Sequence, residues 1–162
     1  MSITIIAAVG RNGEIGRGGD LAFHISADLK RFKALTTGHT VIMGRKTFLS
    51  LPKGALPQRR NIVLTTDPAF TAPGIETAPT LEDALDMAAG TEIFILGGGM
   101  VYTQAMPRAD VLQLTHVHAD DPDADTYFPA VDPAAWQLTD SDGPLTDPRS
   151  GLSYTFATYR RP

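Results

Sequence analysis

The sequence predicts a single α/β domain with a central, mixed but mostly parallel β-sheet of about eight strands, flanked by about four helices. Three observations support this prediction. The 162 residues are enough for one compact core and too few for two ordinary ones, so we expect one domain over residues 1–162. Apolar runs rich in Ile, Val and Leu alternate with stretches of helical spacing, which is typical of parallel sheets. The last quarter lacks helical spacing, which predicts that an antiparallel strand pair closes the sheet.

Each element follows from its own pattern. Buried strands are expected at residues 3–9, 40–43, 61–64, 92–96 and 111–117. Helices are expected at residues 26–35, 45–51, 80–89 and 99–105, the first with Ser26 as its N-cap. The closing strands are expected at residues 136–139 and 152–159, separated by a segment rich in Asp, Gly and Pro.

Composition excludes several classes of protein. The net charge of -4 gives no general attraction to nucleic acid or anionic lipid. The absence of cysteine excludes disulfides, thiolate metal sites and cysteine nucleophiles. The apolar opening at residues 3–9 is too short to span a bilayer and has no basic residue before it, so we expect a cytoplasmic protein with no membrane or nucleic-acid partner.

Asp28 is the most informative single residue. Projection of residues 26–35 onto a helix places Asp28 on one side with Leu29, Phe32 and Leu35. An aspartate in a first helical turn can simply stabilise the helix dipole, but it does so equally well from a solvent-facing position. A carboxylate on an apolar face is costly unless a donor satisfies it. Asp28 is therefore a candidate functional group.

Two predicted strands turn through glycine directly into helices. Gly44 is followed by Arg45 and Lys46, and residues 97–99 are three glycines. Free amides at a helix start bind anions, and the two cations strengthen the field. Neither turn has the spacing of a Rossmann fingerprint or a Walker loop, and each could be a tight connection only. Together they favour a pyrophosphate held from two sides.

A glycine-rich loop separates the first strand from the Asp28 helix. Residues 10–24 contain five of the 15 glycines. Long loops in small domains are commonly functional, so we expect a lid beside Asp28, with a floppy connection as the alternative.

Metal binding has little support in the sequence. Aspartates alternate over residues 121–125 as in a calcium loop, but Thr126 occupies the position that requires glycine. His116 and His118 share one face of a strand without a third ligand nearby. We therefore expect no metal site.

Several motifs together are similar to those of the bacterial dihydrofolate reductase family. The most specific are Val-Ile-Met-Gly-Arg-Lys-Thr at 41–47, Gly-Gly-Gly-x-x-Tyr at 97–102 and Ala-Asp-Leu-x-x-Phe-Lys at 27–33. Residues 7–8, 15–16, 56–64 and 126–129 extend the resemblance nearly end to end. It implies a dihydrofolate reductase-like fold. It also implies NADPH-dependent reduction of 7,8-dihydrofolate to 5,6,7,8-tetrahydrofolate, with hydride to C6 and a proton to N5.

The resemblance implies a pterin pocket with one acid. Asp28 would bond the 2-amino group and N3 of the pterin, Thr115 would support Asp28, and ordered water would deliver the proton. Arg59 would bind the glutamate carboxylate of the substrate. The implied catalytic residues are Asp28, Leu21, Phe23, Thr115 and Tyr102. The implied substrate contacts are Ile6, Ala7, Asp28, Leu29, Phe32, Leu51, Leu56, Arg59, Leu96 and Thr115.

The resemblance also implies NADPH as the cofactor. Arg45 and Lys46 would meet its 2'-phosphate, the 97–98 peptide would be cis, and Asp125 would hydrogen-bond the closed lid. The implied cofactor contacts are Ala8, Ile15, Gly16, Gly44, Arg45, Lys46, Thr47, Leu64, Thr65, Thr66, Leu96, Gly97, Gly98, Gly99, Met100, Val101, Tyr102 and Thr126. The family further implies a monomer that binds antifolate inhibitors.

Some positions depart from the family pattern. Leu21, Ala22 and Phe23 stand where Leu-Pro-Trp is common, so the indole N–H that fixes a water near the substrate is missing. Met100 replaces a cation that often helps bind the 2'-phosphate. Proton supply and NADPH preference are the functions these changes affect.

Two other functions remain open at this point. A pyrimidine reductase of riboflavin biosynthesis shares the implied fold, but it would not need Asp28 together with Arg59. A non-catalytic nucleotide-binding or calcium-regulated module would use the glycine turns and the acidic loop at residues 121–125, but this function would not explain Asp28.

Overall fold

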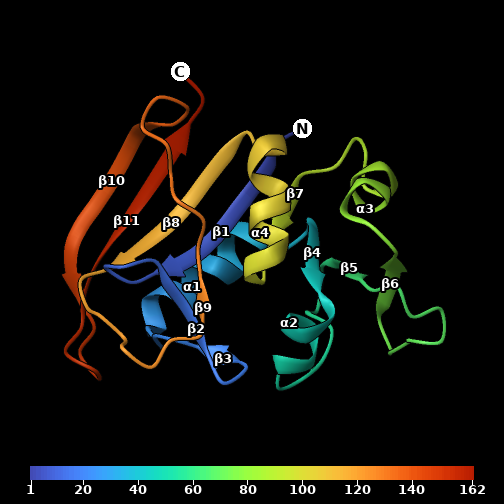
Figure 1. The fold of residues 1–162 in the computed structure, drawn as a ribbon, viewed down its shortest axis with the longest axis horizontal. Helices are drawn as coiled ribbons and strands as arrows, with labels where there is room; N and C mark the ends of the chain where they lie inside the picture. Colours follow the sequence, from blue (N-terminus) through green and yellow to red (C-terminus); the bar gives the residue numbers. More distant parts are fainter.

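The computed structural model describes residues 1–162 as one α/β domain (Figure 1). The strands are β1 (Ile3–Val9), β2 (Glu14–Arg17), β3 (Asp20–Leu21), β4 (Thr40–Gly44), β5 (Arg60–Leu64), β6 (Ile75–Ala78), β7 (Ile93–Ile95), β8 (Val111–Val117), β9 (Thr126–Tyr127), β10 (Gln137–Thr146) and β11 (Ser153–Arg160). The helices are α1 (Ser26–Thr36), α2 (Arg45–Ser50), α3 (Leu81–Met87), α4 (Gly99–Ala105) and the short 3-10 helix η1 (Met106–Arg108). None of them is long and apolar enough to cross a membrane.

The main sheet confirms the predicted architecture. Its eight strands have the order β10-β11-β8-β1-β7-β4-β5-β6. All neighbours from β8 to β6 are parallel, whereas β11 is antiparallel to both β8 and β10. The chain begins in the middle with β1, moves outward to β6, and returns through β7 before it builds the other half. The carboxyl ends of β1, β4 and β7 therefore meet where the winding changes direction, the usual place for a ligand in an open α/β sheet.

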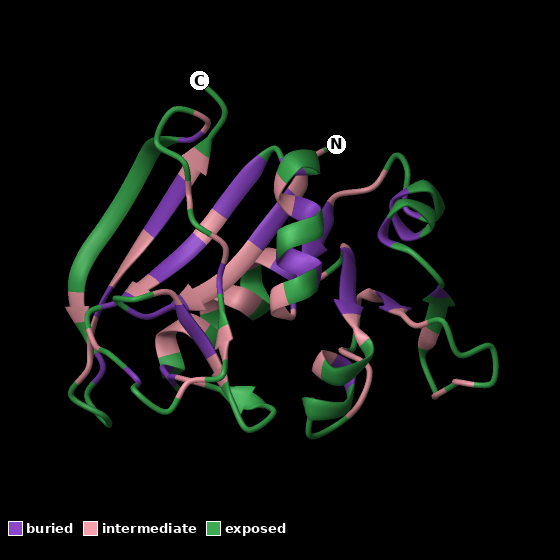
Figure 2. Cartoon of the chain, in the orientation of Figure 1, coloured by how far each residue is buried: buried purple, intermediate pink, exposed green.

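Side-chain alternation along the strands divides the core between the two faces of the sheet. Val41 and Met43 pack with Phe48 of α2 in one cluster, while Ile42 belongs to a larger cluster with side chains of α3 and α4. In Figure 1, α4 crosses in front of the sheet and α1 lies behind it. Figure 2 shows the buried residues concentrated in the central strands, with the edge strand β10 exposed.

The predicted start of α1 is wrong in one detail. Ile25, not Ser26, is the N-cap, and no side chain caps the helix locally. Asp147, from the distant β10–β11 connection, lines the same surface hollow as Ser26. Hydrogen bonds from the hydroxyl and amide of Ser150, and a weaker contribution from the Ser26 amide, hold the pKa of Asp147 below its ordinary value. An acid remote in sequence thus lies at the positive end of this helix.

The other differences concern exposed elements. β10 extends well beyond the predicted residues 136–139, because pairing with β11 extends it while nearly all its side chains remain in solvent. α3 is shorter than predicted and begins after Thr80, whose side chain accepts a hydrogen bond from the Asp83 amide at 3.1 Å. β6 and the small β3-β2-β9 sheet were not predicted, since they are short and largely exposed.

Candidate active site

Asp28 and Thr115 form a buried polar pair between α1 and β8. The Thr115 hydroxyl donates a 2.5 Å hydrogen bond to Oδ1 of Asp28, and Thr115 is only 2% exposed. Burial raises the pKa of Asp28 and outweighs the opposing effects of the Thr115 hydroxyl and the Arg31 cation. No protein donor reaches Oδ2, so one carboxylate oxygen is fixed and the other is available to a ligand.

A wall of half-buried apolar side chains adjoins this carboxylate. These residues come from β1, α1, the end of α2, the 51–56 segment and the end of β7, and several pack against the smaller core cluster. Side chains that are left half-exposed side by side can be covered by an apolar ligand. The predicted substrate contacts among them are Ile6, Ala7, Phe32, Leu51, Leu56 and Leu96.

Arg59 lies at the far end of α1 from Asp28. Its Nη1 donates to the hydroxyl of Thr36 at 3.1 Å, its Nε donates to the Pro57 carbonyl at 2.9 Å, and it stacks over Phe32 at 5.9 Å. Thr36 is eight residues after Asp28, which corresponds to about 12 Å along a helix. The Asp28 carboxylate and the Arg59 guanidinium therefore lie near opposite ends of α1, and the ring of Phe32 lies beside Arg59.

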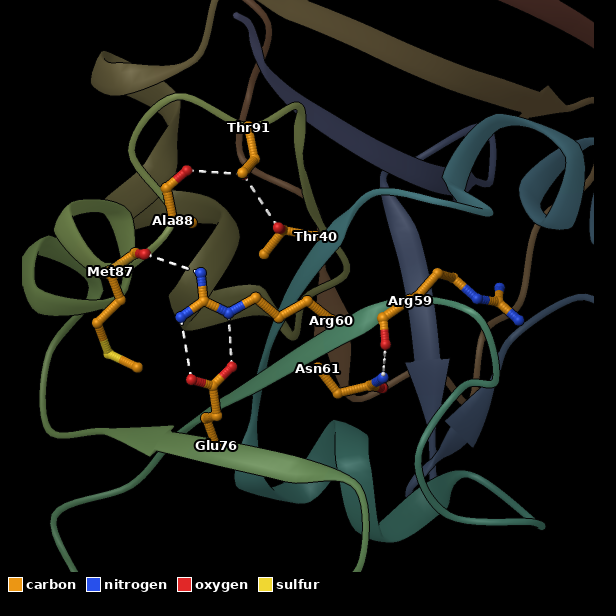
Figure 3. Close-up of polar contacts among 8 residues, drawn as sticks. All are labelled: Thr40, Arg59, Arg60, Asn61, Glu76, Met87, Ala88 and Thr91. Atoms are coloured by element: carbon orange, nitrogen blue, oxygen red, sulfur yellow. Dashed lines mark hydrogen bonds and ion pairs between the residues drawn. The ribbon is translucent and has the colours of Figure 1, made fainter.

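Two adjacent arginines have different surroundings, and only the Arg59 guanidinium is left without a carboxylate partner. Figure 3 shows Arg59 and Arg60 pointing to opposite sides of β5. Arg60 forms a fork with both carboxylate oxygens of Glu76, at 2.5 and 3.0 Å, and donates to the Met87 carbonyl at 2.8 Å. The Arg60 guanidinium is thus paired with a carboxylate within the protein, whereas the Arg59 guanidinium has no carboxylate partner.

The two glycine turns lie side by side. The Gly44 amide donates to the Gly97 carbonyl at 2.8 Å, and the Gly97-Gly98 peptide is cis, as the resemblance implied. A Cβ at Gly97 would lie 2.9 Å from the ring of Tyr102, so no larger residue fits there. The hydroxyl of Thr47 lies 3.5 Å from the position of a Cβ at Gly98. The backbone of Gly44 at the end of β4 and that of Gly97 and Gly98 after β7 therefore lie next to each other.

Tyr102 links the ends of two central strands. Its hydroxyl hydrogen is shared between the carbonyl oxygens of Ile6, at 2.8 Å, and Leu96, at 2.9 Å. Burial, and then the nearby Asp28 carboxylate, raise the pKa of Tyr102, so the phenol remains neutral. Tyr102 therefore fixes the spacing between β1 and β7 where the two halves of the cleft meet.

Cations and hydroxyls lie beside the glycine turns. Arg45 stacks over Phe70 at 4.7 Å and lies 3.7 Å from Asp67, and its guanidinium remains 46% exposed. The Asp67 amide donates to the Thr65 hydroxyl at 3.1 Å. Lys46 and Thr66 are exposed and Thr47 is half-buried; Leu64 is half-buried and Val101 is buried.

The segment predicted to act as a lid is hydrogen-bonded to the acidic loop. Asp125 accepts a hydrogen bond from the Gly18 amide at 2.9 Å, which matches the expectation for Asp125. The buried carboxylate of Glu14 accepts from the amides of Asn12 and Asp121, both at 2.7 Å. Burial pushes the pKa of Glu14 up, but these amides outweigh it and the pKa lies below its ordinary value. The side chain of Thr126 lies between Gly16 of the predicted lid and Gly99 of α4, so the predicted lid and the glycine turn at residues 97–99 both contact β9.

The unusual positions have distinct surroundings. Phe23 is 9% exposed and packs with Ile25, Val117 and Tyr154 under the lid. Leu21 and Leu29 are 45% and 50% exposed, and Met100 is 79% exposed. Ala8 is half-buried and Ile15 is buried. Phe23 is therefore well packed, and its side chain offers no hydrogen-bond donor.

The two histidines singled out in the sequence are bonded to β11. His116 pairs with the Tyr159 hydroxyl at 2.8 Å, and His118 pairs with the Thr155 hydroxyl at 2.9 Å. No group of three or more His, Asp or Glu side chains is placed to hold a metal ion.

Comparisons with known proteins agree with this arrangement. The family model described as dihydrofolate reductase matches residues 2–161. The chain belongs to the dihydrofolate reductase family. It is 43% identical to a dihydrofolate reductase of Neisseria meningitidis serogroup A and 40% identical to the type 3 enzyme of Salmonella typhimurium, in each case over 99% of both chains. Its structure matches that of dihydrofolate reductase from Enterococcus faecalis complexed with NADP(H) and RAB-propyl, with a TM-score of 0.91, 32% identity, and 99% and 96% of the two chains covered.

Sequence reasoning missed three polar residues that the structure places near Asp28 or the predicted lid. Arg31 and Gln113 form a second bridge from α1 to β8, and Glu14 joins the lid to the acidic loop. Arg31 had a signal, because it lies three residues after Asp28 and so shares its helical face. The contacts of Gln113 and Glu14 span 82 and 107 residues, and no local pattern reports such contacts.

Proposed function

We propose that the protein reduces 7,8-dihydrofolate to 5,6,7,8-tetrahydrofolate with NADPH. The observation that carries this proposal is the half-buried Asp28 carboxylate, which is fixed at one oxygen by Thr115, together with Arg59 about 12 Å away along α1 and the half-buried apolar side chains of α1, β1 and the 51–56 segment. A pterin offers an amino group and a ring N–H to one carboxylate, and the glutamate of the substrate offers a carboxylate to the guanidinium. The family membership of the chain supports the same substrate.

The protein's own residues orient and polarise the substrate. Asp28 would accept hydrogen bonds from the 2-amino group and N3 of the pterin, while Thr115 keeps the carboxylate in place. Phe32, Leu51 and Leu56 would cover the flat rings and exclude water. The C6=N5 double bond gains a hydride at C6 and a proton at N5. Ordered water would supply the proton, and Phe23 has no N–H to hold that water.

The residues present fit NADPH. A Cβ at Gly44 would lie 3.3 Å from Val101 and a Cβ at Gly97 would lie 2.9 Å from Tyr102, so glycine lets the two turns pack closely together. Arg45 and Lys46 beside them offer cations to a 2'-phosphate near Thr65 and Thr66. When bound, NADPH supplies the hydride. Tyr102 would flank the nicotinamide, and the lid from Ile15 to Leu21 would exclude solvent from it. The same proposal includes a monomer in the cytoplasm whose cleft also admits antifolate inhibitors.

The test is to follow the loss of NADPH absorbance when purified protein is mixed with dihydrofolate. Turnover is expected, and Asp28→Asn should lower kcat/KM on the order of 100-fold, because the carboxylate that orients the pterin is lost. Lys30→Gln removes an exposed charge from the same helix and should leave the rate unchanged. No turnover of dihydrofolate, or undiminished turnover by Asp28→Asn, contradicts the proposal.

A further inference from the structure

Two polar bridges join α1 to β8, and only the first belongs to the cleft described above. In the first, Thr115 donates to Asp28. In the second, Nη2 of Arg31 donates to Oε1 of Gln113 at 2.8 Å. Residues three apart on a helix share a face, and residues two apart on a strand share a face. The bridges therefore lie side by side, with the charges of Asp28 and Arg31 roughly 7 Å apart, the two-residue spacing of a strand.

The Arg31 guanidinium is held in place. It stacks on the ring of Phe156 with 4.5 Å to the centroid. Its acceptor Gln113 is itself fixed, because Oε1 also accepts from the Thr158 hydroxyl at 2.8 Å. Phe156 and Thr158 on β11 pair with Thr115 and Gln113 on β8, so all four side chains face α1. Arg31 is half-buried there and keeps a defined distance from the Asp28 carboxylate.

The charges around this pair have a simple arrangement. Arg31 is the charged group that acts on Asp28, while Thr115 and Tyr102, which also lie near that carboxylate, are neutral. On its other side Arg31 faces Asp140 and Asp142 of the exposed strand β10. Burial of Asp28 favours its protonated form, and the fixed cation opposes this effect.

We infer that Arg31, held against Phe156 and Gln113 beside the bridge between Asp28 and Thr115, is a positioning residue whose fixed cation favours the ionised form of the Asp28 carboxyl. The inference rests on the proposed function, since an ionised Asp28 matters because it accepts hydrogen bonds from the pterin. It goes beyond that function by assigning a role to a residue that touches neither substrate nor cofactor.

The test is a titration of the protein labelled with 13C at its aspartate carboxyls, with the Asp28 resonance assigned by Asp28→Asn. Arg31→Gln should raise the proton affinity of Asp28 about threefold, the low end of what a unit charge roughly 7 Å away produces at a half-exposed site. Arg31→Lys keeps the charge and should restore most of the wild-type titration. Lys30→Gln is the matched control, since this exposed cation of α1 should have no effect.

Two outcomes overturn the inference. In one, Arg31→Gln titrates as the wild type does. In the other, Arg31→Lys shifts Asp28 as far as Arg31→Gln, which would mean that the contacts of Arg31 matter and its charge does not. Should Arg31→Gln fail to fold, Arg31→Met keeps the packing on Phe156 and decides the same question. The titration needs no substrate, so a wild type without turnover would reject the proposed function separately. If the wild type does turn over, the pH profile of kcat/KM for Arg31→Gln should shift to higher pH together with the titration of Asp28.

Discussion

Replacement of Thr115 by valine isolates the hydrogen bond that fixes Asp28. Valine has nearly the shape of threonine but carries a methyl group in place of the hydroxyl. Thr115 is 2% exposed, so no water replaces the lost donor without rearrangement. The variant therefore retains the carboxylate of Asp28 and leaves Oδ1 without its protein partner.

The size of the effect follows from the kind of bond. A hydrogen bond to a charged group contributes about 1.5–3 kcal/mol, roughly twice the contribution of a neutral pair. Because each 1.36 kcal/mol corresponds to about a factor of ten, Thr115→Val should lower kcat/KM for dihydrofolate roughly 10- to 100-fold. The hydroxyl also lowers the pKa of Asp28, so its removal should let burial raise that pKa further.

Steady-state kinetics at neutral pH measure this loss, with Thr40→Val as the control. Thr40 is also 2% exposed, and its hydroxyl pairs with that of Thr91 at 3.0 Å at the amino end of β4 (Figure 3), whereas Asp28 belongs to α1. Thr40→Val should cost stability without changing kcat/KM. If Thr115→Val stays within twofold of wild type, or if Thr40→Val loses as much activity, the assigned role of Thr115 is wrong.

Three further predictions concern the cofactor turn, the lid and the phosphate contacts. Gly97→Ala should melt at a lower temperature and lose NADPH binding, because the φ of 109° at Gly97 disfavours a side chain and the new Cβ would meet Tyr102. Gly90→Ala is the control: its φ of 84° is also positive but the space around it is open, so its melting temperature should fall less. Glu14→Gln should lower the free energy of unfolding by about 1–3 kcal/mol at neutral pH, measured with denaturant. Because the pKa of Glu14 is lowered, the difference in this free energy between wild type and variant should become smaller as acid protonates the native carboxylate. A difference that does not change with pH contradicts this. Arg45→Gln should raise the KM for NADPH about tenfold and leave that for NADH unchanged; equal changes would show that Arg45 does not contact the 2'-phosphate.

The central sheet could be predicted from the sequence because its residues are buried on both faces. Runs such as 40–43 and 111–117 are rich in Val, Leu, Ile and Met and mostly buried, and the structure places them inside the sheet. β10 has no such signal, since its side chains are exposed and its length is set by pairing with β11. The N-terminus of α1 also lacked a local signal, because the acid beside it, Asp147, belongs to a distant loop.

The site could be predicted only in part, for a related reason. Asp28 was visible because an acid on an apolar helix face is unusual, and the glycine turns were visible because their spacing is local. Without the family resemblance, Arg59 would be interpreted as an ordinary solvated charge. Only the structure shows that Arg60 is paired with Glu76 while Arg59 is bonded to Thr36 of α1. The contact of Arg31 with Gln113 joins a helix to a strand 82 residues away, so it is defined by the fold alone.

The departures from the family pattern fall on groups that act through the solvent. Met100 is 79% exposed, so a missing cation there leaves Arg45 and Lys46 to neutralise a phosphate, while Asp67 competes for Arg45 at 3.7 Å. Phe23 keeps its buried packing under the lid and lacks only an N–H that would orient water. Neither change touches the pair of Asp28 and Thr115. We therefore expect the two departures to affect cofactor preference and proton supply and to leave pterin recognition unchanged.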